Sequence, residues 1–178
     1  SFKGLVEELR KAAPEKKFVI STVTETGNRI AQGIGKAGDL VTYLPLDFSF
    51  IVRRVIEQVN PSLFIIAETE VWPNLISCLY RKGIPVVTVN GRVSDKSFRG
   101  YSWIKLLMQP LLNKISLFLM QTERDADRLV RLGASADKVK ATGNMKFDNA
   151  AVRNDYQDAR IKLGLAPGVK LLVAGSTH

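Results

Sequence analysis

Two carboxylates follow an apolar segment near the middle of the chain. The segment spans residues 63–67, and Glu68 and Glu70 come directly after it, ahead of Pro73. An apolar run of this length predicts a buried strand, and a proline so placed is typical of a helix's first turn. Extended side chains two positions apart point the same way and lie about 7 Å from each other. The sequence therefore predicts a pair of carboxylates suited to proton transfer, at the sheet edge where open α/β folds bind ligands.

A candidate cation follows the next predicted strand, residues 84–90. Arg92 lies in the loop after it, and Ser94 is expected to cap the next helix. A guanidinium group can hold phosphate or carboxylate in a bidentate manner. The alternative is an interior ion network in which Arg92 pairs with Glu68 or Glu70, and both interpretations remain open.

A hydroxyl-rich turn follows the predicted strand 18–22. It carries four candidate binding residues, Thr22, Thr24, Thr26 and Gly27. A junction between strand and helix points backbone N–H groups and hydroxyls outward, which suits a phosphate or a sugar hydroxyl. The alternative is that Thr24 or Thr26 simply caps the helix expected over residues 26–36.

Two more loops with polar side chains follow predicted strands late in the chain. Asn144 and Lys146 lie in the first, and the second contains Ser176, Thr177 and His178. Lys146 is placed either to meet an anion or to be an ordinary surface lysine. His178 is the only histidine and has no second ligand near it, so we expect no metal site.

The elements that would position these loops alternate between strand and helix. Asp47 is expected to cap a helix that ends near residue 59, and Pro110 is expected to interrupt a helix over residues 98–115. Alternation with short connections predicts an α/β fold, with a Rossmann-like parallel sheet and helices on both faces. The predicted strands are 18–22, 39–42, 63–67, 84–90, 117–120, 139–141 and 170–174, and the other predicted helices are 3–13, 73–82, 122–133 and 155–164.

Composition limits the classes of partner. The chain has 178 residues and a net charge of +9, which favours phosphate-rich partners. Its basic residues are scattered, without the tract or aromatic pattern of a nucleic-acid-binding surface. The basic amphipathic helix over residues 98–115 could lie on a membrane, although an apolar stripe that faces the core is the commoner arrangement. One cysteine, Cys78, fits a reducing compartment, and the chain's start at Ser1 suggests a fragment.

Seven segments in order resemble the Kdo (3-deoxy-D-manno-octulosonic acid) transferases of lipopolysaccharide synthesis, which are membrane-associated glycosyltransferases with the two-domain B-type fold. The most specific are residues 68–75 (ETEVWPNL) and 142–148 (TGNMKFD). One departure is Gly91, where the family pattern has alanine. The other matching segments are 22–27 (TVTETG), 43–47 (YLPLD), 90–94 (NGRVS), 121–126 (QTERDA) and 175–178 (GSTH), together with Pro61 and Tyr101.

The resemblance implies a division of labour within a longer protein. Residues 1–150 would form the acceptor-binding domain, lacking its start, and residues 151–178 a linker helix and the first strand of the donor-binding domain. The implied reaction moves Kdo from CMP-Kdo to the lipid A precursor with inversion, without a metal or other cofactor, at the cytoplasmic face of the bacterial inner membrane. The anionic membrane surface would be a partner, and nucleic acid would not.

The resemblance also changes the roles expected of the site residues. The family's general base is a glutamate in a Gly-Glu motif that precedes the first helix seen here, so it is expected upstream of Ser1. Glu68 and Glu70 would then orient that base or bind acceptor hydroxyls, while Arg92 and Lys146 neutralise anionic groups. The fragment alone is expected to be inactive. An alternative of another class is a non-catalytic Rossmann-like module that binds a nucleotide or nucleic acid.

Overall fold

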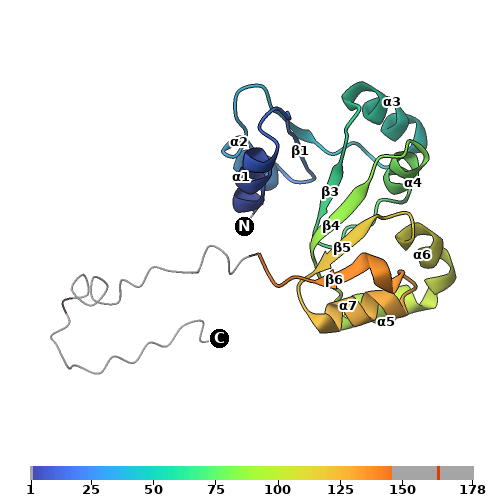
Figure 1. The fold of residues 1–178 in the computed structure, drawn as a ribbon. Helices are drawn as coiled ribbons and strands as arrows, with labels where there is room; N and C mark the ends of the chain where they lie inside the picture. The colour runs from blue at the N-terminus through green and yellow to red at the C-terminus, as the bar shows by residue number, and fades with distance from the viewer. Residues whose placement is uncertain (1, 146–163, 165–178) are drawn as a thin grey trace.

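Strands and helices alternate along the chain in a computed structural model, which describes residues 2–145 and Gly164 (Figure 1). The strands are β1 (Val19–Thr22), β2 (Leu40–Tyr43), β3 (Phe64–Ala67), β4 (Val86–Gly91), β5 (Leu117–Met120) and β6 (Val139–Ala141). The helices are α1 (Phe2–Ala12), α2 (Glu25–Gln32), α3 (Ser49–Val59), α4 (Pro73–Arg81), α5 (Asp95–Trp103), α6 (Lys105–Leu112) and α7 (Glu123–Arg131). The predicted domain at residues 151–178, with its helix and strand, lies outside the described residues.

All strand pairs in the described residues are parallel. One sheet has the order β1-β2 and the other the order β3-β4-β5-β6. Parallel neighbours joined by helices are the arrangement that the sequence predicts, so the α/β fold class is confirmed. In the described part of the chain, β1 and β3 are each paired on one side only.

Helices lie on opposite sides of the molecule according to the strands they connect. Figure 1 shows α1 and α2 beside β1 and β2, and α3 to α7 on the far side of β3 to β6. Successive strands are added in one direction from β1 to β2 and in the opposite direction from β3 to β6. Because the crossovers between parallel strands are right-handed, a reversal of direction places the connecting helices on the opposite face. The carboxyl ends of β3 to β6 therefore remain open for the polar loops.

The main core lies between the four-stranded sheet and α4, α6 and α7. Its fully buried members include Ile76, Leu79, Val86, Phe118 and Leu129. Burial of each such side chain contributes about 1.5–3 kcal/mol. This core holds the strand ends, and thus the loops that follow them, in fixed positions.

Gly91 allows β4 and β5 to approach closely at the end where the loops begin. A Cβ atom at this position would lie 2.6 Å from Met120 Sδ. The register between the strands also shifts between Thr88 and Gly91. Glycine at position 91 therefore leaves room for the Met120 side chain.

The predicted helix over residues 98–115 is wrong in one respect, because it breaks at Ile104 and not at Pro110. Ile104 ends α5 and begins α6 with φ −113° and ψ 24°, whereas Pro110 lies inside α6. The bend lets both helices face the core, with Tyr101 packed against it and Met108 and Leu111 buried. The predicted core-facing stripe is thus confirmed for most of its members.

Candidate functional site

The loops after β3 and β4 are joined by the hydroxyl of Thr69. Arg92 N donates to Thr69 Oγ1 at 2.7 Å, and Thr69 Oγ1 donates to Arg92 O at 2.6 Å. The backbone of Arg92 is thereby fixed, while its side chain is exposed. The structure thus holds a cation candidate at the sheet edge with its guanidinium free to meet a ligand.

Asn90 connects two further loops to this edge. It is 2% exposed and has φ 55°, a left-handed conformation that asparagine adopts more readily than most residues. Its Oδ1 accepts from Met145 N at 3.2 Å, and its carbonyl accepts from Gln121 Nε2 at 3.0 Å. Asn144, a predicted site residue, donates to Gln121 Oε1 at 3.2 Å. The loops after β4, β5 and β6 therefore form one hydrogen-bonded cluster.

Sequence reasoning did not single out Asn90, Gln121 or Thr69 as site residues. Asn90 and Gln121 do each directly end or follow a predicted strand, which is a usable signal. Their partners are more than 20 residues away, however, so only the folded sheet reveals the cluster. Thr69 gave no signal beyond its place between the two carboxylates.

Glu68 and Glu70 do not form the extended pair that their spacing predicts. The strand ends at Ala67, and Glu68 has φ 61°, which is uncommon for a residue other than glycine. Glu70 accepts a hydrogen bond from Trp72 Nε1 at 3.0 Å. Both carboxylates belong to exposed residues at the mouth of the sheet edge. Strain of this kind gathers at functional sites and supports a role for the segment.

The ion network that was the alternative interpretation of Glu68, Glu70 and Arg92 is not formed. In residues 2–145, no cation lies within salt-bridge distance of either carboxylate, and Arg92 has no acidic partner. All three residues are exposed, so burial does not force them to pair. Their charges face solvent at the candidate site.

Asp47 contacts the segment that carries the carboxylates, and the prediction that it caps α3 is wrong. Its carboxylate accepts from Asn74 N at 3.0 Å and Leu75 N at 2.8 Å, so it caps α4. Asn74 Nδ2 also donates to Asp47 O at 2.6 Å. Trp72, at the N-cap of α4, provides no side-chain hydrogen bond, so these N–H groups need an outside acceptor. The exchange fixes the loop after β2 to the start of α4.

The hydroxyl-rich turn after β1 supplies the cap of α2. Thr24 Oγ1 accepts from Gly27 N at 3.1 Å, which confirms the capping alternative for Thr24. A Cβ atom at Gly27 would lie 3.0 Å from that hydroxyl oxygen, so glycine permits the tight turn. Thr22 Oγ1 donates to Thr24 O at 3.4 Å, and Thr26 is exposed.

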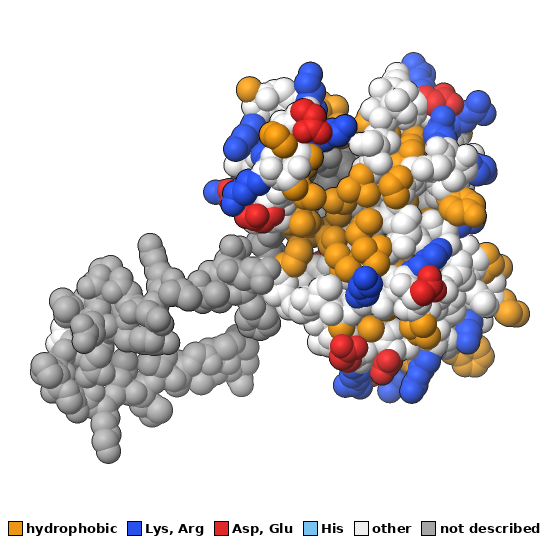
Figure 2. Space-filling view, in the orientation of Figure 1, with side chains coloured by type: hydrophobic (Ala, Val, Ile, Leu, Met, Phe, Trp, Pro, Cys, Tyr) orange, Lys and Arg blue, Asp and Glu red, His pale blue; other side chains and the backbone are white. Residues whose placement is uncertain are grey.

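A pocket of about 270 Å³ lies between this turn and the first carboxylate loop. Thr22 and Thr24 from the turn line it, together with Glu70 and Trp72 from the loop after β3. Residues of β3 also line it, among them Phe64 and Ile65. Figure 2 shows a broad apolar area in the hollow between the two groups of elements. The structure therefore brings the hydroxyl turn and Glu70 to a single pocket with a mixed polar and apolar lining.

Ser94 and Asp125 anchor the loop after β4 to two helices. Ser94 caps α5 by accepting from Ser97 N at 3.1 Å, as predicted. Asp125 is buried in α7, and its Oδ1 accepts from Val93 N at 2.8 Å. Thr122 caps α7, with its Oγ1 accepting from Asp125 N at 3.1 Å. Arg92 therefore lies between two fixed points, Thr69 on one side and Val93 on the other.

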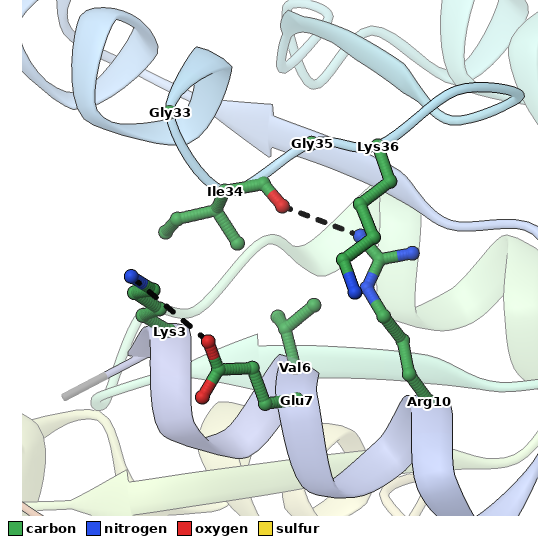
Figure 3. A pocket seen from close by; sticks show the side chains of 8 residues that line it. All are labelled: Lys3, Val6, Glu7, Arg10, Gly33, Ile34, Gly35 and Lys36. Atoms are coloured by element: carbon green, nitrogen blue, oxygen red, sulfur yellow. Dashed lines mark hydrogen bonds and ion pairs between the residues drawn. The ribbon is translucent and has the colours of Figure 1, made fainter.

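A second pocket, of about 300 Å³, lies away from this edge, between α1 and the loop that follows α2 (Figure 3). Arg10 extends along it, donates to Ile34 O at 3.3 Å and pairs with Asp39. The guanidinium of Arg10, with the N–H groups of Lys36 and Phe18, lowers the pKa of Asp39 to about 2, although desolvation of the carboxyl acts to raise it. These groups satisfy one another, so the pocket is a structural joint and not a second candidate site.

Other predicted features concern metals, membranes and the end of the chain. Among the described residues, no group of three histidine, cysteine or acidic side chains could hold a metal ion. No described helix is both long enough and apolar enough to cross a bilayer. Lys146, Ser176, Thr177 and His178 lie outside the described residues, so their roles stay predictions.

Comparison with solved structures supports the fold. One crystal structure of a UDP-N-acetylglucosamine 2-epimerase superimposes with a TM-score of 0.60, covering 91% of this chain and 48% of that chain at 16% identity. A putative enzyme of the same name from Listeria monocytogenes gives a TM-score of 0.58 at 13% identity over 91% of this chain and 47% of its own. At such low identity the likeness concerns the fold alone. Each match covers about half of a longer chain.

The relatives found by sequence identify the family, whereas the solved structures show the fold alone. A 3-deoxy-D-manno-octulosonic acid transferase of Chlamydophila psittaci is 33% identical over 98% of this chain and 41% of its own length. The enzyme of that name from Haemophilus influenzae is 37% identical over 81% of this chain and 34% of its own. A bifunctional glycosyltransferase/methyltransferase of Fusobacterium nucleatum is 36% identical over 98% of this chain and 28% of its own length.

The chain thus spans less than half the length of these curated relatives. A family model described as 3-deoxy-D-manno-octulosonic-acid transferase (kdotransferase) matches residues 1–149, which include every loop of the candidate site that the structure describes. The chain therefore belongs to the 3-deoxy-D-manno-octulosonic acid transferase family of glycosyltransferases.

Proposed function

We propose that this chain forms the acceptor-binding part of an enzyme that transfers Kdo from CMP-Kdo to the lipid A precursor in lipopolysaccharide synthesis. The family match over residues 1–149 carries this proposal. The transfer inverts the anomeric centre and needs no metal. The donor binds to a second domain outside residues 1–150, and the longer protein works at the cytoplasmic face of the bacterial inner membrane.

The pocket between the hydroxyl turn and the Glu70 loop is the proposed place for the acceptor sugar. Its lining combines hydroxyls and a carboxylate with apolar residues. Sugars bind through their hydroxyls while their ring faces pack on apolar surface, so this lining suits them. The apolar residues of the lining also offer a place for the acyl-bearing side of a lipid-linked sugar.

Arg92 and Lys146 are proposed to meet the anionic groups of the substrates. Arg92 has an exposed side chain on a doubly anchored backbone, which suits bidentate recognition of phosphate or carboxylate. An inverting transfer needs one carboxylate to accept the proton of the attacking hydroxyl and cations to stabilise the departing phosphate. The base is supplied by a glutamate outside this chain, with Glu68 and Glu70 holding it or the acceptor.

The test is a transfer assay on the full-length protein, with CMP-Kdo and an acylated, phosphorylated glucosamine disaccharide in detergent. Mass spectrometry of the lipid should show the addition of Kdo. Folded full-length protein that adds no Kdo would overturn the proposal. Residues 1–178 alone should show no turnover, and turnover by that piece would contradict the proposed division of labour.

Substitutions separate a functional carboxylate from a structural one. Glu70→Gln preserves the hydrogen bond from Trp72 in shape, so the protein should fold normally while its kcat/KM falls by orders of magnitude. Glu68→Gly is the matched probe, because glycine adopts φ 61° without strain. It should leave the melting temperature equal or higher. Loss of stability without a specific loss of activity would assign both carboxylates to architecture.

A binding assay addresses the alternative of a non-catalytic module. Filter binding with CMP-Kdo, the lipid A precursor and an oligonucleotide compares the three ligands on one full-length protein. Retention of the acceptor and the donor is expected. Retention of the oligonucleotide alone would favour a nucleic-acid module over a transferase.

A further inference from the structure

Helix α7 binds both backbone groups of Val93, the residue after Arg92. The N–H of Val93 donates to Asp125 Oδ1 at 2.8 Å, and its carbonyl accepts from Arg128 Nη1 at 2.6 Å. Asp125 and Arg128 are one helical turn apart on α7, so their side chains share a face of the helix. Val93 lies beyond the end of β4, and these two side chains replace the partners that a neighbouring strand provides within a sheet.

The backbone of Arg92 is bound in the same manner by another element. Thr69 Oγ1 accepts from the N–H of Arg92 and donates to its carbonyl. Two consecutive residues therefore have all four of their backbone polar groups bound by side chains from distant parts of the chain. Of residues 91–93, Arg92 alone is exposed. The loop thus has a fixed backbone and presents a single cationic side chain.

The two side chains of α7 are charged, and both are largely buried. Asp125 is 7% exposed, and the side chain of Arg128 is 13% exposed. Within residues 2–145, Asp125 has no cation at salt-bridge distance, and it also accepts a hydrogen bond from Thr122 Oγ1. Burial of charged groups costs free energy, and apolar residues of similar size often stabilise a protein as well or better. Two such groups on the backbone of one loop residue indicate that the position of this loop matters.

Arg128 also fixes the element that follows the loop. It pairs with Asp95, the first residue of α5, and its guanidinium lies 6.0 Å from the centre of the Phe98 ring. Figure 1 shows α5 and α7 next to each other. One guanidinium therefore joins the loop, α5 and α7.

We propose that Asp125 and Arg128 are positioning residues that set the place of the Arg92 guanidinium, and that they affect the reaction through Arg92 alone. The inference rests on the proposed function, in which Arg92 meets an anionic group of a substrate. A bidentate contact of guanidinium with phosphate or carboxylate requires both groups in one geometry. A misplacement of about 1 Å can lower the rate about a hundredfold. A fixed backbone at positions 92 and 93 prevents such a displacement.

The first test is a double-mutant cycle on the full-length protein in the detergent transfer assay. Arg128→Met removes the guanidinium and keeps an apolar stem. It should lower kcat/KM about tenfold when Arg92 is present and leave kcat/KM unchanged in the Arg92→Ala background. The free energy of unfolding should fall equally in both backgrounds, because Arg128 binds the carbonyl of Val93 and not the Arg92 side chain. An equal loss of kcat/KM in both backgrounds would overturn the proposal.

Arg124→Met is the matched control. Arg124 lies on the same helix and binds the same carboxylate, Asp95, at 3.2 Å, but in the described part of the chain it has no hydrogen bond to Val93. This variant should keep the kcat/KM of the parent protein. Arg128→Lys can still donate to the Val93 carbonyl and should restore part of the activity that Arg128→Met loses. Equal losses from Arg124→Met and Arg128→Met would assign the effect to the ion pair with Asp95 and overturn the proposal.

A second pair of variants tests Asp125. Asp125→Asn keeps an oxygen that can accept from the N–H of Val93, whereas Asp125→Ala leaves that N–H without its acceptor. Activity should fall in the alanine variant and be largely retained in the asparagine variant. The Arg92→Ala background should abolish the difference between them. A difference that persists in that background would contradict action through Arg92. If Asp125→Ala does not fold, the Arg128 series decides the question.

Hydrogen exchange of the full-length protein follows the loop independently of the reaction. The Val93 amide should exchange slowly in the parent protein, faster in Asp125→Ala and Arg128→Met, and at the parent rate in Arg124→Met. Unchanged exchange in all variants would overturn the proposal. Faster exchange with unchanged kcat/KM would overturn the positioning role and leave the proposed function standing. A parent protein that shows the expected exchange but transfers no Kdo would instead overturn the proposed function.

Discussion

Thr69 and Arg92 are bound to each other through a reciprocal pair of hydrogen bonds, although 23 residues separate them along the chain. One hydroxyl serves as both donor and acceptor, and it joins the loops after two adjacent strands. The pair defines where the Arg92 side chain begins. Its position then determines which anion that guanidinium can reach.

Replacement of Thr69 by valine should disturb the site more than the fold. Valine keeps the shape but leaves the N–H and C=O of Arg92 without their partner, at a loss of about 1–3 kcal/mol in stability if water does not replace it. Full-length Thr69→Val should lose about tenfold or more in kcat/KM, while Thr69→Ser retains both hydrogen bonds and activity. Equal activity in both variants would show that Arg92 needs no such anchor.

Asp47 offers a test of long-range capping. Asp47→Ala removes the acceptor of two N–H groups at the start of α4, so the free energy of unfolding should fall by about 1–2 kcal/mol. Chemical denaturation measures this loss. Asp47→Asn keeps one acceptor oxygen and should lose less. A control at Ser49, the first residue of α3, should have little effect, because α3 has no side-chain cap to lose.

The close approach of Gly91 and Met120 predicts a coupled pair of mutations. Gly91→Ala places a methyl group 2.6 Å from the methionine sulfur, so it should destabilise the protein by about 1–3 kcal/mol. Met120→Ala alone leaves a cavity and should also destabilise it. The double variant should lose less free energy of unfolding than the two single variants lose in sum. A double-mutant cycle measures this difference. Strict additivity would contradict the steric account.

The ion pair between Arg10 and Asp39 predicts a pH dependence of stability. Because folding lowers the pKa of Asp39 from 3.8 to about 2, its contribution is complete above pH 3.8 and disappears as the pH falls through about 2. Asp39→Asn should therefore reduce the free energy of unfolding by roughly 1 kcal/mol at neutral pH, allowing for solvent screening of the pair. The difference from the parent protein should vanish near pH 2. A difference that persists there would assign the effect to packing.

Local patterns in the sequence predict much of this fold. Hydrophobic runs and capping residues need only a few neighbours, so the six described strands and the caps at Thr24, Ser94 and Thr122 follow from short segments. Alternation of strand and helix then predicts a parallel sheet. The polar loops at its carboxyl edge follow from that topology.

Features that depend on distant partners were missed or wrong. Asp47 precedes α3 in sequence, yet its carboxylate meets N–H groups 27 and 28 residues away. The bend at Ile104 serves two core contacts at once, and neither is visible in a helical periodicity. Glu68 is not extended, so the alternation of side chains that would have aligned it with Glu70 stops before this residue. Each of these three features is determined by tertiary contacts, because the local sequence is equally compatible with the predicted and the observed conformation.

The unpaired edges of β1 and β3 have a practical consequence for anyone handling this chain. Segments of both strands line the same pocket, and a row of free backbone groups is a template for any extended polypeptide. A segment inserted there would gain partners on both sides, and by mass action it would raise the melting temperature. At high protein concentration, neighbouring molecules compete for the same slot. Self-association through this slot is therefore an expected consequence of the strand order in the described residues.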